Sequence, residues 1–164
     1  MQHRSSVFEL TCAPISTVRI GLVGAGQRGR ATLSRYAYVE GAEFRAVVDP
    51  DPTAVASALE LLREQRRPLP ETSTNAAAWR ELCRREDIDL IYICTDWNNH
   101  AAMAVEAMRC GKHVAVEVPA ATTVADCWEL VRTAEATQRH CFMTENCCYD
   151  WFALATLDMH RRGV

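Results

Sequence analysis

Three glycines after an apolar run are the first candidates for chemistry. Gly24, Gly26 and Gly29 have the spacing G-x-G-x-x-G directly after the β-branched run 18–23. Between a strand and a helix, the first glycine permits a tight turn, the second lets a diphosphate approach the main chain, and the third lets helix and strand pack closely. The start of the helix then offers free N–H groups to the phosphates. The alternative is a tight turn that serves the fold alone.

An acid follows at the end of the next apolar run. Asp49 lies 20 residues after Gly29. A carboxylate there can accept hydrogen bonds from the ribose 2′-hydroxyl of a dinucleotide, and it repels a 2′-phosphate, so the motif predicts NAD rather than NADP. Arg28, inside the motif, either contacts the cofactor phosphates or is a solvated residue on the helix surface. Both readings stay open.

Polar residues also end two later apolar runs. In "CTDWNNH", residues 94–100, Trp97 could stack on a flat ring, and Asn98 and His100 could bond ribose hydroxyls. The alternative is that Asn98 or Asn99 caps the helix that follows. Glu117 ends an otherwise apolar strand, where a carboxylate is either ion-paired or directed at a ligand, and we favour the ligand.

The elements that would position these residues alternate along the whole chain. Strand patterns alternating with helix patterns predict an α/β fold, a doubly wound parallel Rossmann sheet of about six strands with helices on both faces. Strands are expected at 18–24, 43–49, 89–95, 113–118 and 141–146, helices at 27–39, 51–65, 75–86, 99–111, 122–138 and 150–162, and a loop at 66–74, which holds two prolines. The carboxyl ends of parallel strands share one edge, so the glycine motif and the polar clusters should meet there.

Capping residues support three of the helix starts. Asp51 precedes Pro52, Asn75 precedes an apolar-periodic segment, and Thr123 has Asp126 three residues later in the manner of a capping box.

Length and charge limit the class of protein. The 164 residues suit one domain, which we place at 18–164 after a loose leader at 1–17. A formal net charge of -3 with mixed signs gives no reason to expect nucleic-acid binding. The apolar runs are too short to cross a membrane, and the first residues do not form a secretory signal, so a cytoplasmic protein is expected.

The chain has eight cysteines but no C-x-x-C motif. Neither a zinc ribbon nor a thioredoxin-type pair is indicated, and no metal site is expected. Most cysteines fall in apolar segments and are expected to be buried, reduced thiols. The adjacent pair Cys147–Cys148 is the exception to this expectation. Neighbouring cysteines rarely form a disulfide, because the bridge would strain the peptide between them.

Five segments together resemble a known family. "GLVGAGQRG", "VVDPD", "CTDWNNH", "GKHVAVEVP" and "TENCCYD", in this order and spacing, are similar to the N-terminal domain of the Gfo/Idh/MocA oxidoreductases. More narrowly, they resemble the branch that includes glycoside hydrolase family 109, the NAD-dependent α-N-acetylgalactosaminidases. The resemblance covers nearly the whole chain from about Val18, and residues 117–150 are its most specific part.

The resemblance implies a set of NAD contacts. By position in the matching motifs these are Arg28, Gly29, Asp49, Trp97, Asn98, Asn99, His100, Glu117, Val118 and Asn146. Val118 and Asn146 are the two that the residues themselves do not indicate.

One position departs from the wider family. Most of its oxidoreductases end the fifth strand with Glu-Lys-Pro, whose lysine assists proton transfer, whereas this chain has Glu117-Val118-Pro119. The only lysine is Lys112, at the start of that strand. A simple polyol dehydrogenase is therefore less favoured than the glycosidase-like members, which share the missing lysine.

The implied reaction is a redox-assisted cleavage of a sugar derivative. NAD oxidises a sugar hydroxyl transiently, the neighbouring C–H loses a proton, the glycosidic substituent is eliminated, water adds, and the hydride returns. Glu117 and Tyr149 are the catalytic candidates, although Tyr149 could instead begin the packing of the last helix.

The resemblance also implies a second, substrate-binding domain and homo-oligomers formed through it. The alternatives that remain are an NAD-dependent sugar dehydrogenase and a stand-alone NAD-binding or interaction module without catalysis.

Overall fold

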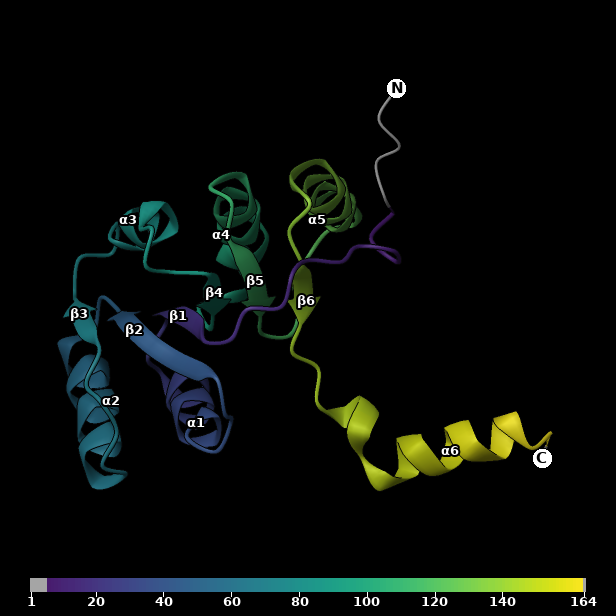
Figure 1. Cartoon of the computed structure of the whole chain (residues 1–164), viewed down its shortest axis with the longest axis horizontal. Helices are drawn as coiled ribbons and strands as arrows, with labels where there is room; N and C mark the ends of the chain where they lie inside the picture. Colours follow the sequence, from purple (N-terminus) through teal and green to yellow (C-terminus); the bar gives the residue numbers. More distant parts are fainter. Residues whose placement is uncertain (1–5, 164) are drawn as a thin grey trace.

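A six-stranded parallel sheet forms the centre of the computed structural model, which describes residues 6–163 (Figure 1). The strands are β1 (Val18–Val23), β2 (Ala42–Val48), β3 (Glu71–Ser73), β4 (Leu90–Ile93), β5 (His113–Val116) and β6 (Cys141–Met143). Their order is β3-β2-β1-β4-β5-β6, so the chain starts in the middle and winds outward twice. The predicted α/β Rossmann sheet is confirmed, and its switch point lies between β1 and β4.

Helices cover both faces of this sheet. Figure 1 shows α1 (Gln27–Tyr36) and α2 (Pro52–Glu64) on one face, and α3 (Trp79–Arg84), α4 (Trp97–Arg109) and α5 (Val124–Thr137) on the other. The last helix, α6 (Trp151–Arg161), extends away from the sheet after a short 3₁₀ helix, η1 (Cys147–Tyr149), and has no buried residue. The crossovers place each helix over the strands that it connects.

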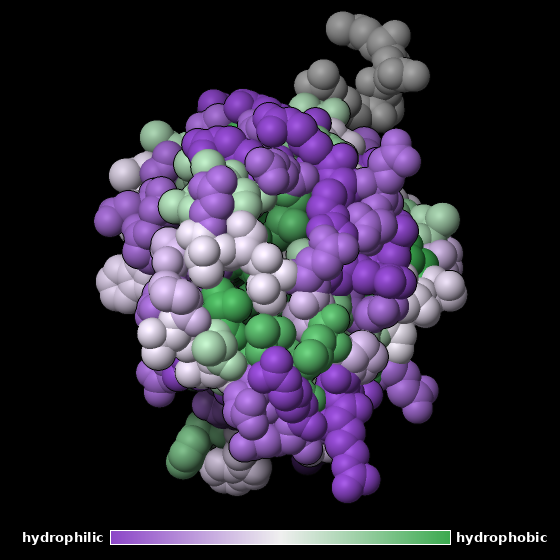
Figure 2. Space-filling model, turned by 90° about the vertical axis from the view of Figure 1, so that its left-hand side faces the viewer, coloured by the Kyte–Doolittle hydropathy of each residue, from purple (hydrophilic) through white to green (hydrophobic). Residues whose placement is uncertain are grey.

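Two apolar cores lie on opposite faces of the sheet. In β4, Leu90 and Tyr92 pack into the core under α1 and α2, whereas Ile91 and Ile93 pack into the core under α4. Successive strand residues point to opposite faces, so a strand covered on both sides is apolar throughout. That requirement explains the nearly continuous apolar run at 89–95. Figure 2 looks at the β3 side, where hydrophobic residues gather in a hollow surrounded by hydrophilic ones.

The capping residues act largely as expected. The Asp51 carboxylate accepts a hydrogen bond from the Thr53 N–H, and the Thr123 hydroxyl accepts one from the Asp126 N–H. The predicted start of the third helix was wrong, because the Asn75 side chain accepts from Ala77 N–H and closes a turn, and α3 begins only at Trp79.

The segment 66–74 was predicted as a loop and contains β3. Two prolines precede this strand and exclude a helix, but the residues after Pro70 are free to pair with β2. The Asp49 N–H donates to Ser73 O at 3.1 Å. This hydrogen bond extends the contact between β2 and β3 to the carboxyl ends of the strands, where the cofactor is predicted to bind. Three residues are too few to show a strand pattern in sequence.

The segment expected as a loose leader is partly anchored. Residues 1–5 lie outside the described part of the chain. Beyond them, Val7 packs against the apolar core, and its N–H donates to Glu135 Oε1 in α5 at 3.3 Å. In Figure 1 this segment runs past α5 and β6 before it enters β1.

The expectation of mostly buried cysteines was wrong. All eight are free, but only Cys83 is fully buried, and burial raises the pKa of its thiol to about 12. Cys12, Cys127, Cys147 and Cys148 are exposed. Helix periodicity alone does not distinguish a thiol on the core side from one on the solvent side. Within residues 6–163, no helix is long and apolar enough to span a membrane.

Candidate functional site

The glycine loop between β1 and α1 is shaped by close backbone contacts. Gly24 has a φ of +95°, and a Cβ on it would lie 2.4 Å from Cys94 O. A Cβ on Gly29 would lie 2.0 Å from Gly24 O. The predicted tight turn and the predicted close packing are therefore both confirmed. At Gly26 a Cβ would meet nothing within 4 Å, which leaves open space at the start of α1.

Asp49 lies at the carboxyl end of β2, beside this loop. Its Oδ2 accepts the Ala25 N–H at 2.7 Å, and its Oδ1 accepts the Asp51 N–H at 2.8 Å. The carboxylate thus fixes the glycine loop relative to β2. A carboxylate has about four lone-pair sites, so each oxygen keeps capacity to accept a further hydrogen bond.

The glycine loop and Asp49 border a cavity of about 380 Å³. Four of the predicted residues line it, namely Gly24, Gly26, Asp49 and Asn99. The other lining residues were not predicted as site residues, and they include Ala76, Trp79, Thr95, Asp96 and Met103. Trp79 and Met103 lie in helix patterns and read as core residues. Thr95 and Asp96 closely follow the end of β4, and that place was the available signal for them, since the ligand crevice of such a sheet lies at the strand ends.

The start of α4 holds the predicted cluster 97–100. Asp96 caps the helix, with its Oδ1 accepting the Asn98 N–H at 3.2 Å and its Oδ2 accepting Asn99 Nδ2 at 2.5 Å. The alternative in which Asn98 or Asn99 is the cap is thus wrong. Trp97 is 62% exposed beside this cap, so its ring is open to a partner.

His100 has partners other than the predicted ribose hydroxyls. Its side chain is only 1% exposed, with Nδ1 2.8 Å from Pro119 O and Nε2 3.0 Å from Thr95 O. Both ring nitrogens are occupied by main-chain carbonyls, so in this arrangement none is free for a ribose hydroxyl. The imidazole instead ties the start of α4 to the turn after β5.

Arg28 and Glu117 form an ion pair. Arg28 Nη2 lies 3.2 Å from Glu117 Oε2, and the carboxylate is buried whereas the guanidinium is half exposed. Of the alternatives left open for Glu117, the ion pair is the one observed, and Arg28 is not simply solvated. Cys94 lies close to them, and burial, with the charge of Glu117 next, raises the pKa of its thiol to about 12.

Val118, Asn146 and Tyr149 lie at the ends of β5 and β6, outside the cavity lining. Val118 is exposed. Asn146 directly precedes η1 as its N-cap, and its carbonyl accepts the Tyr149 N–H at 3.0 Å. Tyr149 is 77% exposed and forms part of η1 rather than of the last helix. Contacts of these three with a cofactor or substrate remain predictions.

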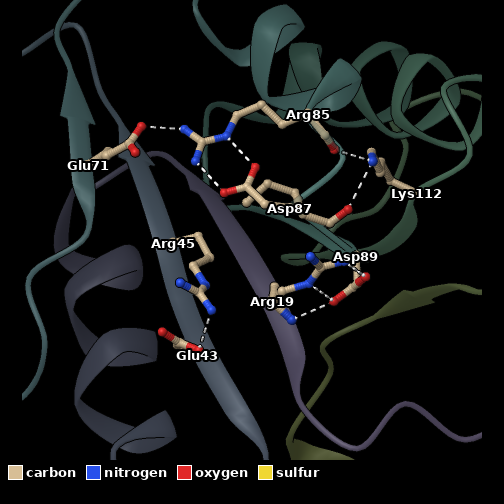
Figure 3. Close-up of polar contacts among 9 residues, drawn as sticks. Arg19, Glu43, Arg45, Glu71, Arg85, Asp87, Asp89 and Lys112 are labelled. Atoms are coloured by element: carbon tan, nitrogen blue, oxygen red, sulfur yellow. Dashed lines mark hydrogen bonds and ion pairs between the residues drawn. The ribbon is translucent and has the colours of Figure 1, made fainter.

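The single lysine, Lys112, directly precedes the amino end of β5 and lies near Arg85 and Asp87 (Figure 3). Lys112 Nζ donates to Arg85 O at 2.5 Å and to Ile88 O at 2.9 Å, and the residue is buried. Around it, Arg85 pairs with Asp87, and the pair lowers the pKa of Asp87 to about 2. Lys112 therefore braces the amino ends of β4 and β5, far from the strand ends that carry Asp49 and Glu117.

A family model described as an oxidoreductase family with an NAD-binding Rossmann fold matches residues 18–145. The chain belongs to the Gfo/Idh/MocA oxidoreductase family. A "Glycosyl hydrolase family 109 protein 2" of Phocaeicola vulgatus is 53% identical over 161 residues, 98% of this chain and 39% of that protein. An "Alpha-N-acetylgalactosaminidase" of Bacteroides fragilis is 48% identical over 98% of this chain and 38% of that protein. The chain thus spans about two fifths of the length of these Gfo/Idh/MocA relatives.

A solved structure has a similar fold. The myo-inositol dehydrogenase of Lactobacillus casei, crystallised with NAD(H) and myo-inositol, superposes with a TM-score of 0.76 at 25% identity, over 90% of this chain and 42% of that one. The chain is therefore an NAD-binding Rossmann domain of the Gfo/Idh/MocA family. Its geometry fits the cofactor, because the space at Gly26 is open and Asp49 retains acceptor capacity beside it.

Proposed function

We propose that this NAD-binding domain serves an enzyme that cleaves the glycosidic bond of an N-acetylated sugar by a redox-assisted route. The relatives named above as a family 109 hydrolase and an α-N-acetylgalactosaminidase support this proposal. Because the chain spans about two fifths of their length, the substrate side of the reaction would involve residues beyond those described.

The choice of glycosidase over dehydrogenase rests on which residue follows Glu117 after the end of β5. Val118 stands where the wider family places its proton-transferring lysine, and Lys112 is buried at the other edge of the sheet with both described contacts to carbonyls. Within residues 6–163, no lysine is therefore placed to reach the reacting carbon.

The chain's own residues have separate tasks in this proposal. N–H groups of the glycine loop would bind the diphosphate, Asp49 would bind the adenosine ribose, and Trp97 would stack on a flat ring. Bound NAD supplies a reversible hydride acceptor. Glu117 is the candidate to hold a proton near the sugar, provided that the ligand displaces its partner Arg28, and Tyr149 is the second candidate.

A cofactor titration tests the binding side. Tryptophan fluorescence should report tighter binding of NAD than of NADP, and Asp49→Ala should narrow the gap because the ribose acceptor is lost. Equal affinity of the unmutated chain for both dinucleotides would contradict the ribose assignment.

An assay on the complete protein tests the reaction. Release of the aglycone from an aryl α-N-acetylgalactosaminide without net NADH supports the proposed glycosidase. Net NADH from a free sugar, without aglycone release, favours the dehydrogenase. NAD binding with neither activity favours a binding module, so either of these two results overturns the proposal.

A further inference from the structure

Two adjacent thiols lie near the carboxyl ends of β5 and β6, on the side of the sheet where the cofactor is predicted to bind. They have no role in the proposed function. Cys147 and Cys148 are the first two residues of η1, and both are exposed and free. Thr144, just before them, donates through its N–H and its hydroxyl to Val116 O, at 2.9 and 3.2 Å. The thiols are therefore held close to the carboxyl end of β5, directly after the predicted NAD contact Asn146.

The geometry of η1 opposes a disulfide between them. Adjacent Cα atoms are about 3.8 Å apart, whereas disulfide-bonded cysteines have Cα atoms roughly 4.4–6.8 Å apart. The turn is also fixed by its own hydrogen bonds, since the Cys147 N–H donates to Glu145 Oε1 at 2.6 Å and the Asp150 N–H donates to Cys147 O at 3.1 Å. Cys148 Sγ donates to Glu145 O at 3.2 Å. The pair should therefore remain a dithiol.

Neighbouring carboxylates keep one of these thiols protonated. A hydrogen bond to Glu145, together with the charges of Glu145 and Asp150, raises the pKa of the Cys147 thiol. Reagents that alkylate a single thiolate react slowly with such a group, because the thiolate is the nucleophile. A reagent that binds both sulfurs gains instead from proximity, because once the first bond has formed the second thiol reacts intramolecularly.

We infer that Cys147 and Cys148 form a binding site for a trivalent thiophilic centre, of the class of monosubstituted arsenic(III) oxides. Two S–H bonds break and two As–S bonds form, while the arsenic oxygen leaves as water with both thiol protons and arsenic stays trivalent. A bridging arsenic atom lets the two sulfur atoms lie farther apart than in an S–S bond, so the peptide between the cysteines is distorted less. Among residues 6–163, no three His, Cys, Asp or Glu side chains are grouped to hold a metal ion, which disfavours a tetrahedral cation.

Occupancy of this site also weakens NAD binding, and this part rests on the proposed function. Asn146 precedes the dithiol directly, so a bulky arsenic substituent displaces its side chain from the cofactor. Loss of one hydrogen bond of about 1.4 kcal/mol corresponds to about tenfold in the dissociation constant.

Phenylarsine oxide and intact-mass analysis test the site. The folded chain should gain one phenylarsenic group, which 2,3-dimercaptopropanol removes. Cys147→Ser and Cys148→Ser should each abolish the adduct, whereas Cys127→Ser, which removes an exposed single thiol of α5, should keep it. An adduct that survives either of the first two substitutions, or no adduct at all, overturns the inference.

A second arm separates this inference from the proposed function. NAD titration of the loaded chain should show the tenfold weakening, and unchanged affinity would overturn the coupling. A chain that forms the adduct but binds no NAD even when unloaded would refute the proposed function and leave the dithiol site intact.

Discussion

Gly26→Ala and Gly29→Ala should separate cofactor binding from folding. At Gly29 the new Cβ starts 2.0 Å from Gly24 O, and real Cβ contacts stay beyond 3.0 Å, so α1 and the loop must separate by about 1 Å or more. Overpacking of this kind costs about 1–3 kcal/mol and sometimes more, which exceeds the gain of about 1 kcal/mol from alanine in a helix. Because the contact is with main chain, we take the upper end of that cost, about 3 kcal/mol, and after subtraction of the gain we expect Gly29→Ala to lower the free energy of unfolding by about 2 kcal/mol.

Gly26→Ala should have the opposite profile. Its Cβ meets no atom within 4 Å and its φ is -62°, so only the weaker capping by alanine acts on stability, at no more than about 1 kcal/mol. The methyl group occupies the space proposed for a phosphate, and loss of a charge-assisted hydrogen bond of about 1.5–3 kcal/mol weakens binding roughly tenfold to a hundredfold.

Urea unfolding and isothermal titration with NAD measure both quantities on each variant. If Gly26→Ala binds NAD as tightly as the parent chain, the diphosphate does not lie at the start of α1. If Gly29→Ala is as stable as the parent, the contact with Gly24 O does not shape the loop.

Three further substitutions test the described contacts. Lys112→Met leaves Arg85 O and Ile88 O without their donor, so the free energy of unfolding measured in urea should fall by about 1–3 kcal/mol while NAD affinity stays unchanged. A large loss of NAD affinity would contradict the bracing role of Lys112. His100→Ala removes the link between α4 and the turn after β5, and a lower melting temperature in a thermal scan is expected, whereas an unchanged one would refute the link. Burial, followed by the charges of Arg139 and His140, lowers the pKa of His113 below 6.5 despite Asp89, so the unfolded chain binds more protons. The free energy of unfolding should therefore fall as pH drops below about 6.5. Urea titrations near pH 7.5 and 5.5 measure this fall, and His113→Gln should make it smaller. An equal fall in the variant and the parent chain would count against a role of His113.

The features predictable from sequence are those set by neighbours along the chain. Asp51 and Thr123 cap their helices through residues two and three positions away, and the apolar β4 reports cover on both faces. The three glycines could be assigned because a turn, an open space and a close contact each demand the absence of a side chain.

The remaining site features depend on partners distant in sequence. Glu117 meets Arg28 across 89 positions, and Asp49 meets the Ala25 N–H across 24. His100 satisfies the carbonyl of Pro119, which no local pattern announces. The strand β3 was missed because three residues gain their conformation from pairing with β2 and carry no period of their own.

The pairing of β1 with β4 has a consequence for the order of assembly. Arg19 in β1 and Asp89 beside β4 meet across 70 positions, so β1 stays without its second neighbour until β4 has left the ribosome. Because non-local parallel pairing is slow, the seam between the two halves closes late. The crevice that receives the dinucleotide lies on that seam, so this binding surface forms only after β4 has paired with β1, and NAD stabilises the paired sheet rather than either half alone.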